Sequence, residues 1–166
     1  MLPAPRTPGR YRIALVCLGN ICRSPMAHVV LAARVADAGL DDRVAVVSAG
    51  TGDWHVGGPM DRRAAALLTA EGYDASRHRA QQVLPSWLEE HDLVLAMDAD
   101  NLRDLRALAS AEPDPERLRR FRDLDPDGPG DVPDPYYGGD DGFRDVLAMV
   151  ERTAEAIVEE VAALVP

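Results

Sequence analysis

The sequence of 166 residues contains no lysine, and all 18 of its basic residues are arginine. The lack of lysine excludes mechanisms that need its amine, such as Schiff-base catalysis and the phosphate-binding loop G-x-x-x-x-G-K-[ST]. Basic residues are also in the minority, because 28 acidic residues give a formal net charge of -10. A negative charge of this size opposes general binding to nucleic acids and to anionic membranes. An anionic ligand must therefore be attracted by a local group of positive charges.

Cysteines and long apolar runs are scarce as well. Two cysteines cannot form the disulfide framework of a small secreted protein. The first residues, MLPAPRTPGRYR, lack the apolar core of a signal peptide, and no segment approaches the roughly 20 apolar residues of a membrane span. The four histidines show no metal-ligand spacing, so we expect no metal site. These absences predict a soluble protein of the cytoplasm.

Apolar periodicity predicts a single domain over residues 11–166, preceded by a flexible N-terminal arm, residues 1–10, that contains three prolines. Strands are predicted at 12–17, 43–49, 92–97 and, more weakly, 116–121; helices at 25–38, 61–71, 85–90, 99–109 and 142–165; and a loop at 122–142. Alternating strands and helices form parallel sheets with helices on both faces. The sequence therefore predicts an α/β three-layer sandwich with a central four-stranded parallel sheet, whose ligands bind beyond the carboxyl ends of the strands.

The segment CLGNICRS, residues 17–24, joins the first predicted strand to the first predicted helix. Gly19 and Asn20 tolerate backbone conformations that turn successive N–H groups inward as an anion-binding nest. The N-terminus of the helix, with Ser24 as its predicted N-cap, and the Arg23 guanidinium complete a pocket for a dianion. Cys17 lies at the mouth of this pocket, where the positive field favours a thiolate nucleophile. Because N–H groups and Arg23 supply the charge of a metal ion, we expect phosphoryl transfer without a cofactor.

The nine residues CLGNICRSP, from Cys17 to Pro25, resemble the signature loop of bacterial low-molecular-weight protein tyrosine phosphatases. The resemblance extends from about Arg12 to the C-terminus through SAGT at 48–51, GDW at 52–54, HRAQQV at 78–83, MDADNLRDL at 97–105 and DPYYG at 134–138. It implies a metal-independent enzyme that hydrolyses phosphotyrosine, an aryl phosphate monoester, through a cysteinyl-phosphate intermediate. It also implies phosphotyrosine-containing proteins or peptides as partners, and phosphate or vanadate as active-site ligands.

The resemblance assigns roles to individual residues. Cys17 would attack phosphorus, Arg23 would bind the phosphate, and Asp134 would protonate the leaving phenol oxygen and later activate water. The other implied positions belong to the phosphate-binding loop, to the walls of the substrate pocket and to the support of the loop. They are Leu18, Gly19, Asn20, Ile21, Cys22 and Ser24 for the loop, Trp54, Tyr136 and Tyr137 for the walls, and Ser48 and His78 for the support.

Two features depart from the pattern of the family: His28 and the Gly- and Pro-rich loop 122–133. His28 stands where many relatives carry an acidic residue. Cys22, in the segment of residues 17–24, has two interpretations: it is a structural residue, or a redox guard that traps Cys17 as a reversible disulfide.

Three other functions compete with the phosphatase. The run DLDPDG at 123–128 opens like an EF-hand calcium loop, but Asp134 stands in place of the glutamate at its twelfth position and prolines stiffen it. An arsenate reductase of the same fold would need a third cysteine in a distant loop. A phosphate-binding module without catalysis would need neither Cys17 nor Asp134. The sequence therefore favours the phosphatase.

Overall fold

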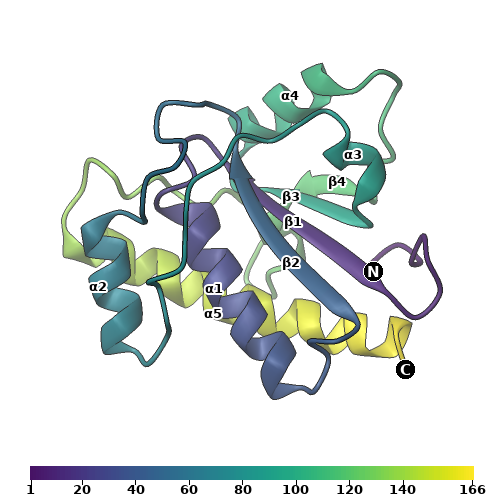
Figure 1. The fold of residues 1–166 in the computed structure, drawn as a ribbon, viewed down its shortest axis with the longest axis horizontal. Coiled ribbons are helices and arrows are strands. Elements are labelled where there is room, and N and C mark those ends of the chain that lie inside the picture. The colour runs from purple at the N-terminus through teal and green to yellow at the C-terminus, as the bar shows by residue number, and fades with distance from the viewer.

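The four predicted strands form one parallel sheet in the computed structural model, which describes residues 1–166 (Figure 1). The strands are β1 (Tyr11–Cys17), β2 (Val44–Gly50), β3 (Leu93–Ala96) and β4 (Leu118–Arg120), in the order β2-β1-β3-β4 across the sheet. All residues of the central strand β1 except Arg12 are buried, because helices cover both faces of the sheet. The predicted fold class is confirmed, and the carboxyl ends of the strands meet at one edge.

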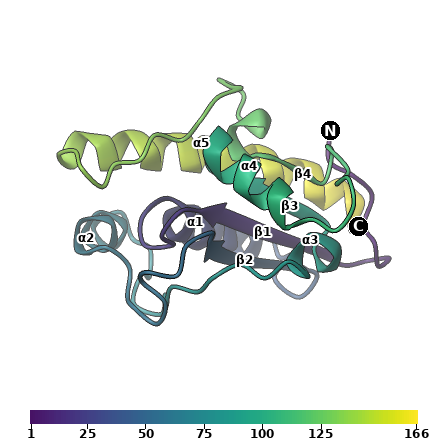
Figure 2. The ribbon, with the colours of Figure 1, turned by 90° about the horizontal axis from the view of Figure 1, so that it is seen from above.

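The helices form two layers around the sheet (Figures 1 and 2). They are α1 (Arg23–Asp37), α2 (Arg62–Ala70), α3 (Trp87–Glu90), α4 (Ala99–Leu108) and α5 (Asp140–Leu164). Helices α1 and α5 pack against each other on one face, α2 packs against α5, and α3 and α4 cover the other face. No helix, including the long α5, has the length and apolar character that a bilayer crossing requires.

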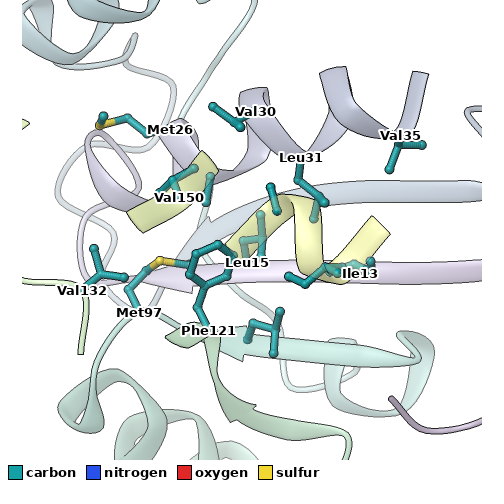
Figure 3. Close-up of a cluster of buried hydrophobic side chains, with 14 of the residues drawn as sticks. Ile13, Leu15, Met26, Val30, Leu31, Val35, Met97, Phe121, Val132 and Val150 are labelled. Atoms are coloured by element: carbon teal, nitrogen blue, oxygen red, sulfur yellow. The ribbon is translucent and has the colours of Figure 1, made fainter. Parts of the chain in front are cut away.

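Two hydrophobic clusters form because successive side chains of β1 point to opposite faces of the sheet. Ile13 and Leu15 belong to the larger cluster with α1 and α5, whereas Ala14 and Val16 belong to the smaller one with α3 and α4. Figure 3 shows the larger cluster, in which the Phe121 ring lies close to Leu15. Phe121 begins a short 3-10 helix, η1 (Phe121–Leu124), in a segment predicted to be a loop from residue 122.

The ends of α1 test two predictions. The prediction of Ser24 as the N-cap is wrong, because Cys22 occupies that position and its side chain makes no capping hydrogen bond. The Ser24 hydroxyl is instead buried and contacts the loop, as described below. At the other end, Gly39 has a φ of 70° and follows the C-cap residue Ala38, as predicted from the conformational freedom of glycine.

Residues 1–10 form no helix or strand, but they lie against the domain. The Leu2 side chain is buried, and the Tyr11 hydroxyl donates to the Pro3 carbonyl oxygen at 3.0 Å. The Arg6 backbone N–H donates to Asp92 Oδ1 at 2.6 Å. This segment therefore differs from the flexible arm predicted from its prolines. Proline prevents regular backbone hydrogen bonding, but it does not prevent burial.

Candidate active site

The loop of residues 17–24 follows β1 directly and leads into α1. Asn20, with a φ of 56°, is the one residue other than glycine that has a left-handed backbone conformation. This conformation curls the loop so that the Asn20 N–H donates to Cys17 Sγ at 3.2 Å. The end of β2 approaches the loop closely: a Cβ at Gly50 would lie 2.6 Å from the Leu18 carbonyl oxygen. Glycine at position 50 therefore permits this packing.

The Cys17 side chain lies at the base of the loop and is buried. Its Sγ is 3.0 Å from Ser24 Oγ, which accepts a hydrogen bond from Asn20 Nδ2 at 2.8 Å. Ser24 Oγ therefore has one hydrogen to donate, and Cys17 Sγ at 3.0 Å is a nearer acceptor than the Ala49 carbonyl oxygen at 3.4 Å. Cys17 Sγ therefore has two donors, the Ser24 hydroxyl and the Asn20 N–H, that can stabilise a sulfur anion.

Asn20 connects the loop to the rest of the domain. Its Nδ2 also donates to Ser48 Oγ at 3.1 Å, and its Oδ1 accepts from the Gln81 N–H at 3.0 Å. Its carbonyl oxygen is 2.7 Å from His78 Nε2. The structure thus places Ser48 and His78 against the loop. Gln81 was missed, because it contacts Asn20 through its backbone, which gives no side-chain signal in the sequence.

A second histidine, His28 of α1, lies behind this network. Its Nδ1 is 3.1 Å from Ser48 Oγ. Ser48 Oγ accepts from Asn20 Nδ2, which leaves the Ser48 hydrogen available to an unprotonated Nδ1 of a neutral His28 ring. Burial, together with the neighbouring His78, lowers the pKa of His28 to about 4, which keeps the ring neutral at neutral pH.

The backbone donors of the loop are available to an anion. The N–H groups of Leu18, Gly19, Ile21 and Cys22 donate to no other protein atom, and those of Arg23 and Ser24 lie in the first turn of α1, where a helix provides no acceptor. The loop therefore offers a set of donors, reinforced by the positive end of the α1 dipole, to a phosphate-like group.

Arg23 is buried, and its guanidinium is held by groups from distant parts of the chain. Its Nη1 donates to Asp98 Oδ2 at 2.6 Å and to the Val132 carbonyl oxygen at 3.0 Å, and its Nη2 is 3.7 Å from Asp134 Oδ2. Burial alone would lower the pKa of Arg23, but the hydrogen bond to Asp98 and the nearby Cys17 and Asp134 raise it overall. The cation is therefore retained in a buried position.

Asp98 was not selected from the sequence. It is the N-cap of α4, where its Oδ1 accepts from the Asn101 N–H at 2.7 Å, while its other oxygen binds Arg23. An aspartate between a predicted strand and a predicted helix is usually interpreted as a cap alone. The second role depends on the approach of the loop from β1.

Asp134 belongs to the segment of residues 132–138, here called the acid loop. The loop begins at the buried Val132, whose N–H donates to the Met97 carbonyl oxygen at 2.8 Å. The Asp134 side chain is partly exposed, and its Oδ1 accepts from the Tyr136 N–H at 3.1 Å. The acid loop thus brings the Asp134 carboxylate to the Arg23 guanidinium.

The predicted aromatic walls surround the mouth of a cavity of about 310 Å³. The cavity is lined by Cys17, Leu18, Gly19, Ile21, Cys22, Arg23, Trp54, His55, Asp134, Tyr136 and Tyr137. Tyr136 and Tyr137 contact each other edge to face, and the Tyr137 and Trp54 residues are 92% and 71% exposed. A charged group can thus enter deeply between polar donors while an aromatic group stays at the rim.

Cys22 is buried and lines the same cavity. Burial, followed by the carboxylates of Asp61 and Asp134, raises the pKa of the Cys22 thiol to about 12. Cys22 is therefore a neutral thiol at neutral pH, which reduces the thiolate fraction that a redox guard would use. Its redox role stays a hypothesis.

The acidic run 123–128 has a structural role at Asp125. Arg152 donates to both Asp125 carboxylate oxygens, at 2.6 and 2.8 Å, and Arg122 Nε donates to Oδ2 at 2.9 Å. These contacts, chiefly the one with Arg152, hold the pKa of Asp125 well below its usual range. The carboxylate is thus paired with two arginines, and no group of three or more His, Cys, Asp or Glu side chains is placed to hold a metal ion.

The sequence of the chain is similar to those of known proteins. The sequence model of the family "Low molecular weight phosphotyrosine protein phosphatase" matches residues 12–165. The low molecular weight protein-tyrosine-phosphatase of Streptomyces coelicolor is 50% identical over 154 residues, which cover 91% of this chain and 93% of the relative. The low molecular weight protein-tyrosine phosphatase A of Mycobacterium tuberculosis is 45% identical over 142 residues, which cover 84% of each chain.

Solved structures show the same fold. YfkJ from Bacillus subtilis superposes with a TM-score of 0.86 at 33% identity, covering 96% of this chain and 98% of that chain. Wzb from Vibrio vulnificus, in complex with benzylphosphonate, superposes with a TM-score of 0.76 at 26% identity, covering 90% and 98%.

Proposed function

Because this chain belongs to the low molecular weight phosphotyrosine protein phosphatase family and is a protein-tyrosine-phosphatase, we propose that Cys17, Arg23 and Asp134 carry out its reaction on phosphotyrosine-containing proteins or peptides. One observation carries the proposal. A buried cysteine with two hydrogen-bond donors, a buried arginine and an aspartate from a distant loop line one cavity.

In the first step the Cys17 thiolate attacks phosphorus, and the bond from phosphorus to the phenolic oxygen breaks. The phosphoryl oxygens bind the free N–H groups of the loop and the Arg23 guanidinium, which stabilise the charge of the transition state. Asp134 gives its proton to the leaving oxygen, so that a neutral phenol departs. The product of this step is a cysteinyl-phosphate.

In the second step a water molecule attacks the phosphorus, and the bond between sulfur and phosphorus breaks. Asp134, now a carboxylate, takes the proton of the water. The Ser24 hydroxyl, 3.0 Å from Cys17 Sγ, donates to the departing thiolate. Inorganic phosphate leaves, and the enzyme returns to its first state. Arginine and N–H groups provide the positive charge at each step, so the steps require no cofactor.

The substrate class follows from the shape of the cavity. Trp54, Tyr136 and Tyr137 surround its mouth with aromatic surface, which suits a flat phenyl ring. The benzylphosphonate of the Vibrio vulnificus Wzb complex combines a phenyl ring with a phosphonate, which supports an aryl phosphate here. Phosphate and vanadate are expected to bind at the loop. The reaction needs a free Cys17 thiol, which favours a reducing compartment such as the cytoplasm.

Hydrolysis of p-nitrophenyl phosphate in excess EDTA tests the nucleophile. The intact protein should be active, and Cys17→Ser should be inactive while still unfolding at a similar temperature. Equal activity in both proteins would mean that another group attacks phosphorus. Inactivity in both would favour a phosphate-binding module or the reductase.

Peptide substrates then test the substrate class. Phosphotyrosine peptide should be hydrolysed faster than phosphoserine peptide and faster than phosphoarginine. Faster release from phosphoarginine would overturn the preference for an aryl group.

A further inference from the structure

We propose that Arg63, in the first turn of α2, is a positioning residue that holds the acid loop over the loop of residues 17–24. The proposal rests on the proposed function, in which Asp134 is the general acid. Arg63 is not itself one of the residues that line the cavity, and no feature of the sequence pointed to it.

Arg63 donates to the backbone of the acid loop at two places. Its Nη2 donates to the Tyr136 carbonyl oxygen at 2.8 Å, and its Nη1 donates to the Gly138 carbonyl oxygen at 3.3 Å. The guanidinium also lies 5.6 Å from the centre of the Tyr136 ring. Apart from the ion pair between Arg23 and Asp134, no other side chain outside the acid loop forms a hydrogen bond or an ion pair with residues 134–138.

Arg63 is itself held in place from two sides. Its Nε and Nη2 face the Asp61 carboxylate at 3.3 and 3.2 Å, and its guanidinium lies over the Phe143 ring of α5 at 4.7 Å. An arginine fork fixed by a carboxylate and an aromatic ring loses less freedom when it binds two carbonyl oxygens. Arg63 is thus a preorganised donor rather than a freely moving surface side chain.

Asp61 links this donor to the loop of the nucleophile. Its backbone N–H donates to the Ile21 carbonyl oxygen at 2.9 Å, and its carboxylate caps α2 by accepting from the Arg63 N–H at 2.9 Å. A continuous path of contacts therefore runs from Ile21 through Asp61 and Arg63 to the acid loop. This path sets the position of the acid relative to the loop that binds phosphate.

The position of Asp134 matters most when the leaving group needs a proton. An unsubstituted phenol, like the tyrosine side chain, has a pKa of about 10 and leaves poorly as an anion. A dinitrophenolate is a far more stable anion and leaves without a proton. A general acid must lie within hydrogen-bond reach of the leaving oxygen. A misplaced acid loop should therefore slow the hydrolysis of phenyl phosphate and spare that of 2,4-dinitrophenyl phosphate.

The test compares kcat/KM for these two substrates, because kcat/KM reports the steps up to the first cleavage. Arg63→Met removes the donors and keeps apolar contact with Phe143. A loss of roughly tenfold on phenyl phosphate is expected, a part of the about 10²-fold to 10⁴-fold that a positioned general acid contributes. The loss on 2,4-dinitrophenyl phosphate should be much smaller. Arg62→Met, a matched change at an exposed arginine without a hydrogen bond or ion pair, should leave both values unchanged.

Asp134→Asn gives the largest loss that removal of the general acid can cause. It also separates the proposal for Asp134 from the proposal for Arg63. It should lose more than Arg63→Met on phenyl phosphate, and adding Arg63→Met to it should cause no further selective loss. Equal losses on both substrates in Arg63→Met, or no loss on either, would overturn the role of Arg63 and leave Asp134 as the acid. If Asp134→Asn itself shows no dependence on the leaving group, the acid assignment fails, and the role of Arg63 fails with it.

Discussion

The loop of residues 17–24 and the acid loop face the same cavity but are held in very different ways. In the first, Asn20 is fully buried, and its backbone and side-chain polar groups all have partners. In the acid loop, Tyr137 is 92% exposed, and Arg63 supplies the only side-chain hydrogen bonds from outside to residues 134–138. The phosphoryl group therefore meets a preformed site, whereas the leaving group meets an exposed rim.

This difference matches the chemistry of the two ends of the substrate. The phosphoryl group is the same in every substrate, and fixed donors stabilise its transition state without reorganisation. The peptide that carries the phosphotyrosine varies, and exposed aromatic rings can contact many sequences. We expect substitutions in the first loop to reduce kcat and stability, and substitutions at the rim to change KM.

The largest effect is expected from Asn20→Ala. It removes the three hydrogen bonds of the Asn20 side chain, to Ser24 Oγ, Ser48 Oγ and the Gln81 N–H, and each such bond contributes about 0.5–1.5 kcal/mol. It also forces alanine into a left-handed conformation, at a cost of about 1–2 kcal/mol. Urea unfolding and kcat/KM for p-nitrophenyl phosphate should both show a large loss.

Asn20→Gly separates these two causes. It relieves the backbone strain but restores no side-chain hydrogen bond, so its stability should lie between those of the intact protein and Asn20→Ala. Full activity in Asn20→Ala would contradict the view that the loop depends on this side chain.

A smaller effect, visible only in acid, is expected from His28→Asn. Burial holds the pKa of His28 near 4, below the usual value of about 6.5, so the unfolded chain binds a proton that the folded chain does not. The resulting stability is complete above pH 6.5 and is lost as the pH falls towards 4. Asparagine is uncharged and keeps an acceptor for Ser48, so the free energy of unfolding should fall less steeply in this range. Urea unfolding of both proteins between pH 7 and pH 4 measures this difference. If the free energy of unfolding falls equally with pH in the two proteins, this interpretation is refuted.

Trp54→Ala should act on the rim alone. Loss of one aromatic contact corresponds to about 0.5–1.5 kcal/mol, or roughly twofold to tenfold in kcat/KM for a phosphotyrosine peptide. The change should lie in KM, since Trp54 contacts none of the groups that hold Cys17. A fall in kcat that exceeds the rise in KM would show that Trp54 also affects the groups around Cys17. Inorganic phosphate, which has no ring, should inhibit both proteins equally.

Tyr137→Ala should have the smallest effect. Its ring contacts Tyr136 edge to face, and the residue is 92% exposed, so stability should change by less than about 0.5 kcal/mol. A thermal unfolding curve that shifts markedly would show that Tyr137 has a structural role. Changes in activity should be limited to substrates with bulky groups beside the phosphotyrosine.

Much of the fold and the inner site could be predicted because they depend on contiguous residues. The apolar run of β1, the loop after it and the glycine at the end of α1 each carry a local signal. Asp98 and Gln81 could not be recognised, since one also caps a helix and the other acts through its backbone. Arg63 could not be recognised either, because it donates to backbone carbonyl oxygens, which carry no signal in the sequence. Ser24 was misassigned as a cap, because its hydroxyl is used by Cys17 and Asn20 across the loop.

The hydrogen bond from Arg23 Nη1 to the Val132 carbonyl oxygen joins positions 109 residues apart in the sequence. Contacts of such long range cannot form until most of the chain has collapsed, and they tend to form late in folding. An intermediate with a complete β1 and α1 would still hold this arginine loosely. Recovery of catalytic activity after dilution from urea should therefore lag behind recovery of helical circular dichroism, and activity should serve as a probe of the last stage of assembly.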